Sequence, residues 1–277
     1  MLASFVAVAG VLAARGKVRE TTLMATWWWC LAAILATVGV EIVEQLGWLG
    51  SESLASPWHY AARTLLLCPT ISLVGAKRPQ AGPWNFIVLS LWAILALPAA
   101  QALLLSRGQP LEVHFHTWFL PVLSFLTLIN LLPTRYALES LLATLGQLLL
   151  LADYLPLPWS LDNRWTSALG MIALASAAVS YAARPSRSAS ANPLDRLWLD
   201  FRDQFGLFWA LRVQERLIDA AQRLDWPVTL TWSGWVTRDG QPITAPLSDE
   251  VLRSILIAFR GLLRRFVSND WIERRTE

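Results

Sequence analysis

Few side chains in this sequence have the chemistry of a site, and they gather near the ends of apolar segments. The three histidines are His59, His114 and His116, while Glu41 and Glu44 lie one turn apart. Imidazole nitrogens and carboxylate oxygens bind metal ions and exchange protons. These five residues are therefore the candidate metal ligands, and two of the imidazoles could instead bind a haem iron. The cofactor predicted from these five residues is therefore a metal ion or a haem.

The spacing of these residues is loose. His114 and His116 are two residues apart, which places them on one side of an extended strand but on opposite sides of a helix. The sequence contains no HExxH, CxxC, phosphate-binding loop, nucleophile elbow or kinase signature. A plain interpretation competes with the metal site, in which the imidazoles are interfacial polar groups and Arg63 pairs with Glu41 or Glu44. No reaction is indicated, which favours a protein that is not an enzyme.

The amino-acid composition indicates whether these residues lie in a membrane or in water. Of the 277 residues, 55% are hydrophobic and 16% charged, with a mean hydropathy of +0.43. Residues 1–183 hold 9 Lys/Arg and 8 Asp/Glu, whereas residues 184–277 hold 14 and 12. This division excludes an ordinary soluble enzyme and predicts a membrane part followed by a water-facing part. The net charge is only +3 and the basic residues are mixed with acids, so we expect no nucleic-acid partner.

Apolar segments long enough to cross a bilayer recur along the membrane part, because a spanning helix needs about 20 apolar residues. The six expected spans are residues 22–40, 58–76, 83–106, 116–133, 136–153 and 165–183. Residues 1–14 are a seventh candidate, short for a full crossing. The expected fold is therefore an α-helical polytopic membrane protein, with a bundle of six or seven transmembrane helices over 1–183, a linker over 184–192 and a small α+β module over 193–277.

Basic residues in the loops predict the orientation of this bundle. Arginine and lysine precede the first full span and recur after every second crossing, at positions 15–19, 77–78, 135 and 184–187. The opposite loops carry almost none. Since basic loops stay on the cytoplasmic side, we expect a multi-pass protein of the cell inner (plasma) membrane with a cytoplasmic C-terminal module. Six tryptophans at span ends fit the interfacial belt, and at least one of Trp27, Trp28 and Trp29 should face neighbouring helices.

Polar residues inside the expected spans are few, among them Asn130, Glu139 and Gln147. Glu139 lies one turn after Arg135, so we expect these two to form an i, i+4 ion pair. Ion-coupled pumps normally place several ionisable groups at mid-depth, and this sequence has none there. Proton or ion pumping is therefore not expected.

The module begins with Asn192 and Pro193, the pattern of a helix N-cap followed by its first residue. A stripe of apolar residues then predicts a long helix to residue 224, alternation predicts a strand over 228–233 with a turn at Asp239–Gly240, and Ser248 caps a last helix. One aromatic part of the stripe could either fill the module's own core or dock a partner or the inner leaflet. The candidate docking residues are Trp198, Phe201, Phe205 and Trp209.

Three functions are compatible with these patterns. The leading hypothesis is a non-catalytic component, or an assembly and anchoring factor, of a membrane complex, with the bilayer and other membrane subunits as partners. The alternative is a metal or haem redox site at the outer face. A third hypothesis is a transporter of a small uncharged or lipid-like solute, which requires a cavity between the spans.

Overall fold

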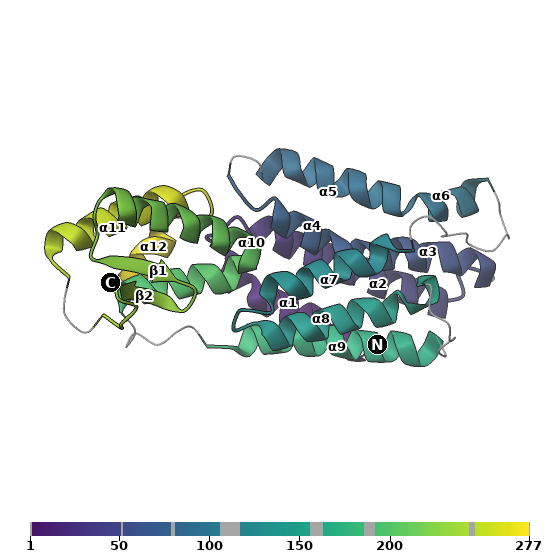
Figure 1. Cartoon of the computed structure of the whole chain (residues 1–277). Helices are drawn as coiled ribbons and strands as arrows, with labels where there is room; N and C mark the ends of the chain where they lie inside the picture. The colour runs from purple at the N-terminus through teal and green to yellow at the C-terminus, as the bar shows by residue number, and fades with distance from the viewer. Residues whose placement is uncertain are drawn as a thin grey trace.

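The computed structural model describes residues 2–50, 52–78, 81–105, 117–155, 163–185, 192–243 and 247–276. Figure 1 shows an elongated molecule in which the N-terminal helices run alongside one another and the C-terminal module covers one end. The described helices of the bundle are α1 (Leu2–Val18), α2 (Met24–Gln45), α3 (Glu52–Thr64), α4 (Cys68–Val74), α5 (Ala81–Leu95), α6 (Leu97–Leu104), α7 (Phe119–Leu131), α8 (Ala137–Leu150) and α9 (Asn163–Ala183), with short 3₁₀ turns at Leu65–Leu67 and Ala152–Tyr154.

Two of these helices are long and apolar enough to cross a membrane, α2 and the Trp165–Ala183 part of α9. A third crossing is added if α5 and α6, which are bent by 51° at Ala96, count as one span. The expected spans 58–76 and 83–106 are interrupted by the 3₁₀ turn before Pro69 and by the bend before Pro98, because proline removes a backbone donor and crowds the preceding turn. Helices α7 and α8 have 13 and 14 residues.

Six helices form a closed ring in the bundle. Around it, α1 contacts α2, α2 contacts α4, α4 contacts α7, α7 contacts α8, α8 contacts α9, and α9 returns to α1. Small residues bring the backbones close: a Cβ on Gly10 would lie 2.9 Å from the Ala178 Cβ, and one on Gly146 would lie 2.9 Å from the Gly170 carbonyl oxygen. Close approach at glycine is the usual way in which apolar helices gain packing contacts without a hydrophobic driving force.

The two ends of the bundle differ in charge, as the loop pattern predicts. At the module end, the Thr22 N–H donates to the Phe266 carbonyl (2.8 Å), the Arg78 N–H donates to the Arg265 carbonyl (2.7 Å), and Arg274 pairs with Glu20. At the other end, the Ser4 hydroxyl donates to Glu41 and His59 pairs with Glu44. Of the basic loop residues, Arg78 lies against Arg265 and Arg135 lies 3.6 Å from Asp203, so both lie beside the module.

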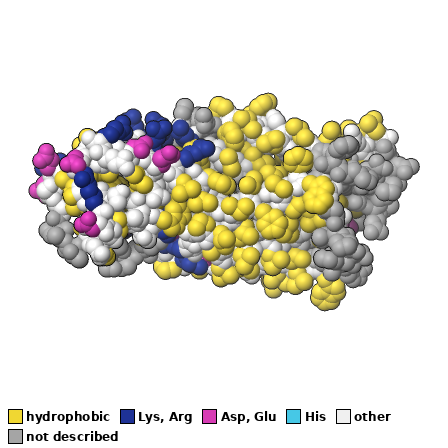
Figure 2. All heavy atoms as spheres, in the orientation of Figure 1, with side chains coloured by type: hydrophobic (Ala, Val, Ile, Leu, Met, Phe, Trp, Pro, Cys, Tyr) yellow, Lys and Arg dark blue, Asp and Glu magenta, His cyan; other side chains and the backbone are white. Residues whose placement is uncertain are grey.

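The surface of the bundle is apolar. Figure 2 shows hydrophobic side chains over most of the visible bundle, with Lys, Arg, Asp and Glu gathered on the module and at its boundary. Trp48, Trp118 and Trp165 are exposed near helix ends, as belt residues would be. Trp27 is buried and its indole N–H donates to the Val11 carbonyl (2.7 Å), whereas Trp28 is exposed. This confirms the expectation that one residue of the tryptophan run faces a neighbouring helix.

The module contains α10 (Pro193–Arg223), β1 (Val228–Thr231), β2 (Gly234–Thr237), α11 (Asp249–Leu263) and α12 (Asn269–Thr276). Both predicted caps are confirmed: the Asn192 side chain accepts from the Leu194 N–H (3.0 Å), and the Ser248 hydroxyl accepts from the Val251 N–H (3.4 Å). The strands form a hairpin in which Leu230 opposes Trp235, so the chain reverses at residues 232–233 and the reversal expected at Asp239–Gly240 lies beyond the hairpin. Helix α12 was not predicted, because its eight residues are mostly polar.

Candidate functional site: a cavity inside the helix ring

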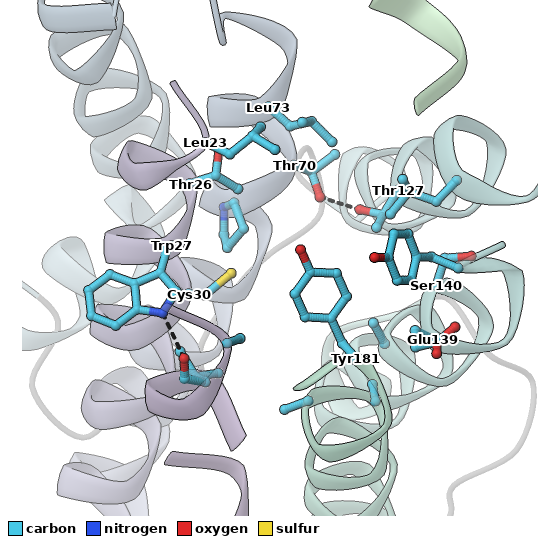
Figure 3. Close-up of a pocket in the computed structure, with 18 of the residues that line it drawn as sticks. Leu23, Thr26, Trp27, Cys30, Thr70, Leu73, Thr127, Glu139, Ser140 and Tyr181 are labelled. Carbon is cyan, nitrogen blue, oxygen red and sulfur yellow. Dashed lines mark hydrogen bonds between the residues drawn. The ribbon is translucent and has the colours of Figure 1, made fainter. Parts of the chain in front are cut away.

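A cavity of about 280 Å³ lies inside the ring of six helices. Every helix of the ring contributes to its wall, and Asp203 and Gln204 of α10 lie at the module end. Figure 3 shows Trp27 and Cys30 on one side, Tyr181 with its hydroxyl directed inward, and Thr70 facing Thr127. The wall is mostly apolar, and its apolar members include Val11, Ala14, Leu23, Ala33, Ile34, Leu66, Leu73, Leu131, Ala143, Leu174, Ala177 and Ala178.

Three side-chain oxygens on the wall of this cavity are buried without a hydrogen-bond donor among the described residues. They are Glu139 Oε2, Gln147 Oε1 and Gln204 Oε1. Glu139 is 5% exposed and Gln147 is 6% exposed, and both lie on the same face of α8. An unpaired buried acceptor costs about 1–3 kcal/mol. Three residues of the mostly apolar wall therefore each carry an unpaired oxygen that neighbouring atoms cover.

The other oxygen of Glu139 is fully engaged. Glu139 Oε1 accepts from Arg184 Nε (2.8 Å) and from the Ser180 hydroxyl (2.9 Å), both at the end of α9. The predicted pair between Glu139 and Arg135 is wrong, because Arg135 turns toward Tyr136 and Asp203 instead. A tertiary contact thus takes precedence over the i, i+4 neighbour, and it ties α8 to α9 beside the cavity.

A buried charged junction connects the cavity to the module. Asp203 is fully buried; its Oδ1 accepts from Arg202 Nη2 (2.7 Å), and its Oδ2 lies 3.6 Å from Arg135 Nε. Arg202 also donates to the Trp232 carbonyl (2.7 Å), which fixes the hairpin. One turn earlier in α10, Asp200 accepts a hydrogen bond from Arg275 Nε (2.8 Å). Burial lowers the pKa of Arg275, and the negative charge of Asp200 opposes that shift.

Helix α10 is interrupted where it reaches the bundle. Gly206 has φ +72° and ψ −171°, a conformation that is essentially restricted to glycine. The side chain of Asn130, at the end of α7, occupies the break: its Oδ1 accepts from the Phe208 N–H (2.9 Å) and its Nδ2 donates to the Phe205 carbonyl (3.3 Å). Asn130 therefore replaces the backbone partners that the interruption removes. The sequence pattern predicted one continuous helix here.

The histidine site expected at the outer face is brought together only in part. His59 Nε2 lies 2.9 Å from Glu44 Oε2, while Glu41 Oε2 is 3.5 Å from the Ser4 hydroxyl. His114 and His116 lie outside the described residues. Within the part of the chain that the structure describes, no group of three or more His, Cys, Asp or Glu side chains could hold a metal ion.

Arg63 does not pair with Glu41 or Glu44, contrary to expectation. It is 4% exposed and donates to the Leu150 carbonyl (3.0 Å), to Asp153 (3.2 Å) and to the Ser167 hydroxyl (2.8 Å). The sequence placed Arg63 near the outer acids by depth alone, which cannot specify which neighbouring helix the guanidinium faces. This arginine instead connects α3 to α8 and α9.

The aromatic stripe suggested for docking packs inside the chain. Trp198, Phe201 and Phe205 are fully buried and Trp209 is 8% exposed. Phe266 contacts the rings of Phe201, Phe205 and Trp209. The Trp209 indole also donates to the Leu73 carbonyl of α4 (3.1 Å). One hydrophobic cluster therefore runs from the bundle into the module, and these four side chains are not part of the free surface.

The sequence pointed to some of the cavity residues without showing the cavity. Glu139, Ala143 and Gln147 recur at intervals of four, so two polar groups flank a small residue on one face of α8. That repeat was the available signal. Cys30, Tyr181 and Gln204 carry no such signal, because each comes from a different helix and only the ring brings them together. No protein family, curated protein or solved structure matches this chain.

Proposed function

We propose that this chain is a multi-pass membrane protein that binds a small uncharged, lipid-like molecule in the cavity of the helix ring. The observation that carries the proposal is the cavity itself, an apolar space of about 280 Å³ between helices whose outer surfaces are also apolar. Such a cavity suits a molecule that partitions into lipid. A cavity of roughly 150 Å³ holds benzene, so a molecule of about a dozen non-hydrogen atoms fits here.

The proposed topology keeps all six or seven crossings, with the module on the cytoplasmic side of the inner membrane. Helices shorter than 18 residues would cross with the help of their neighbours, as α3 with α4 and α5 with α6. Two features support this arrangement: with α3–α4 and α5–α6 each taken as one crossing, successive crossings alternate in direction, and the described loop residues Arg78 and Arg135 lie at the module end. Lysine and arginine in short loops stay on the cytoplasmic side.

Binding of a ligand in the ring is favoured over the other two hypotheses. A role in anchoring a complex was suggested by an aromatic stripe that is now seen to fill the chain's own core. A metal or haem site at the outer face would rest on His59 and Glu44 alone among the described candidates that meet. Neither has an observation of its own comparable with the cavity.

The proposal is tested by filling the cavity. Ala33 of α2 is fully buried and lines the cavity, whereas its neighbour Ala32 is exposed, so Ala33→Leu and Ala32→Leu form a matched pair. The purified protein in lipid nanodiscs is irradiated with a long-chain alkanol that carries a diazirine, and the labelled residues are identified by peptide mass spectrometry. We expect labelling of α2, α8 and α9 at the cavity wall, lost in Ala33→Leu and retained in Ala32→Leu.

Two results would overturn this proposal. One is labelling that is spread over the outer surface of the bundle and is the same in both variants. The other is labelling that an excess of unlabelled alkanol does not reduce. Thermal unfolding of each variant in the same nanodiscs shows that a loss of labelling reports a filled cavity and not an unfolded protein.

A further inference from the structure

We infer that a cluster of basic side chains at the boundary between the bundle and the module binds the phosphate group of an anionic phospholipid. The members of this boundary cluster are Arg19, Lys77, Arg78, Arg264 and Arg265. The inference rests on the membrane topology proposed above and is independent of what the cavity binds. None of the five residues lines the cavity, so the headgroup would be a second ligand at a separate place.

Hydrogen bonds hold three distant segments of the chain together at this boundary, namely residues 19–22, 76–78 and 264–268. The Thr22 N–H donates to the Phe266 carbonyl (2.8 Å), and the Thr22 hydroxyl donates to the Ala76 carbonyl (2.6 Å). The Arg78 N–H donates to the Arg265 carbonyl (2.7 Å). Each segment brings one or two basic residues, so the fold assembles a cluster that no single stretch of sequence contains.

The side chains of the boundary cluster are available to a ligand. All four arginines are exposed, and Lys77 is partly exposed. Within the part of the chain that the structure describes, none of the five makes a side-chain hydrogen bond or an ion pair. Arg135, Arg184 and Arg202, which lie deeper, each pair with an acid.

The boundary cluster carries an excess of positive charge. The one acid of its three segments is Glu20, which already pairs with Arg274, and Asp270 follows two residues after the last segment. Like charges that the backbone holds close together repel one another, and a bound anion relieves that repulsion. Arginine is especially suited to phosphate, because its planar group donates two parallel hydrogen bonds to phosphate oxygens.

The position of the boundary cluster favours a lipid as the source of that phosphate. The cluster borders the apolar surface of the bundle: Val74, one turn before Arg78, is 43% exposed, and Phe86 on α5 is 72% exposed. Figure 2 shows Lys and Arg side chains gathered where the hydrophobic surface begins. In the proposed topology this is the level of the cytoplasmic headgroups, where anionic lipids attract clusters of basic residues next to a span.

The inference is tested by lipid binding to the full chain, purified in a neutral detergent. The probes are dioleoyl phosphatidylglycerol, which is anionic, and dioleoyl phosphatidylcholine, which carries no net charge. Native mass spectrometry measures the affinity of each lipid for the wild type and for two double variants. Arg264→Gln/Arg265→Gln removes two charges of the boundary cluster. Arg223→Gln/Arg253→Gln removes two exposed charges at the far end of the module, since Arg253 lies about 16 Å from Arg264 along α11.

We expect the wild type to bind phosphatidylglycerol at least about tenfold more tightly than phosphatidylcholine, because each basic residue near a headgroup contributes about fivefold in affinity. This preference should weaken as the salt concentration rises. In Arg264→Gln/Arg265→Gln the affinity for phosphatidylglycerol should fall at least about tenfold, and that for phosphatidylcholine should not change. The control variant should stay within about threefold of the wild type, because its charges lie beyond a Debye length.

Three results would overturn the inference. The first is equal binding of the two lipids by the wild type, a measurement that needs no variant to fold. The second is an equal loss in both double variants, which would assign the attraction to the net charge of the module. The third is displacement of phosphatidylglycerol by polyglutamate, which would assign the boundary cluster to an acidic protein. Circular dichroism confirms that each variant is folded.

Failure of this inference and failure of the proposed function are distinguishable. If the lipids bind equally while the alkanol labels the cavity wall, only the headgroup site is overturned. If the preference for phosphatidylglycerol is present while Ala33→Leu labels like the wild type, only the proposed cavity ligand is overturned.

Discussion

The bundle and the module differ in how many apolar side chains they expose. In the bundle, many large hydrophobic residues face outward, and the buried positions include polar groups such as Thr37, Ser124 and Gln147. In the module, tryptophan and phenylalanine fill the interior, and among its described residues only Leu211, Leu224 and Ile257 are large, hydrophobic and exposed. The same chain therefore follows two rules, one for a lipid-like and one for an aqueous surrounding.

The bundle and the module meet at a junction of charged side chains. There the chain buries full charges, with Asp203, Arg202 and Arg135 held together between α7, α8 and α10. A buried charge is tolerated only when it is paired and hydrogen-bonded. The comparison shows that neither rule applies at this boundary, where paired charges and the Asn130 side chain connect the two parts.

The largest expected effect comes from removing one charge of the junction. Asp203→Ala leaves Arg202 and Arg135 without the carboxylate between them, so we expect the free energy of unfolding to fall by about 3–5 kcal/mol. Thermal and denaturant unfolding of the purified protein measures the loss. Asp219→Ala is the control, because Asp219 is an exposed acid on the same helix. Equal stability of the two variants would show that the junction does not connect the parts.

A charge placed on the outside of each part tests the two rules directly. Leu35 is 49% exposed in the middle of α2 and Ile257 is 70% exposed on α11. In Leu35→Asp, insertion into the membrane should become less favourable by about 2.5–3.5 kcal/mol, whereas Ile257→Asp should change stability by less than about 1 kcal/mol. The fraction of each variant recovered in washed membranes reports insertion. Full recovery of Leu35→Asp would contradict a lipid-facing α2.

Gly206→Ala tests the interrupted helix at the contact with α7. An alanine Cβ there would lie 2.3 Å from Asn130 Nδ2 and would keep a positive φ, so we expect a loss of about 2–3 kcal/mol. Gly261→Ala is the matched control, because Gly261 lies inside α11 with open space around it. That change should stabilise the helix by about 0.5–1 kcal/mol. A gain of stability in both variants would mean that α10 continues straight past Gly206.

The smallest effect concerns Asp195 in the first turn of α10. Burial raises the pKa of Asp195, and the hydrogen bond from the Trp235 N–H (2.7 Å) counteracts part of that shift. The folded state therefore favours the protonated carboxyl, so its contribution to stability is present at low pH and is lost as the pH rises through the folded pKa. Asp195→Asn keeps an acceptor for Trp235 and does not ionise.

The relative stability of Asp195→Asn should accordingly increase with pH. Unfolding measured between about pH 3 and pH 7 should show little difference at the acidic end and a growing advantage for the variant toward neutrality. A constant difference across this range would show that Asp195 does not titrate differently in the folded state.

Local patterns in the sequence correctly predicted much of this architecture. The caps at Asn192 and Ser248 are confirmed, because a cap depends on neighbours in the chain. A hairpin forms where a strand was predicted, but it reverses at residues 232–233 and not at Asp239–Gly240. The number of crossings depends on whether proline interrupts a segment. Pro69 and Pro98 do so in two of the expected spans. In the described chain, two helices, or three with the bent pair, are long and apolar enough to cross a membrane, and the six or seven crossings remain a proposal.

The sequence by itself determined the division into an apolar part and a charged part, because the surroundings of each part dictate its composition. Tertiary structure alone decided which groups meet: Glu139 with Arg184, Arg63 with Asp153, and Asn130 with the break at Gly206. These pairs join residues from 45 to 90 positions apart. Periodicity shows the face on which a side chain lies but not which helix it faces, and for that reason only the assembled ring reveals the cavity.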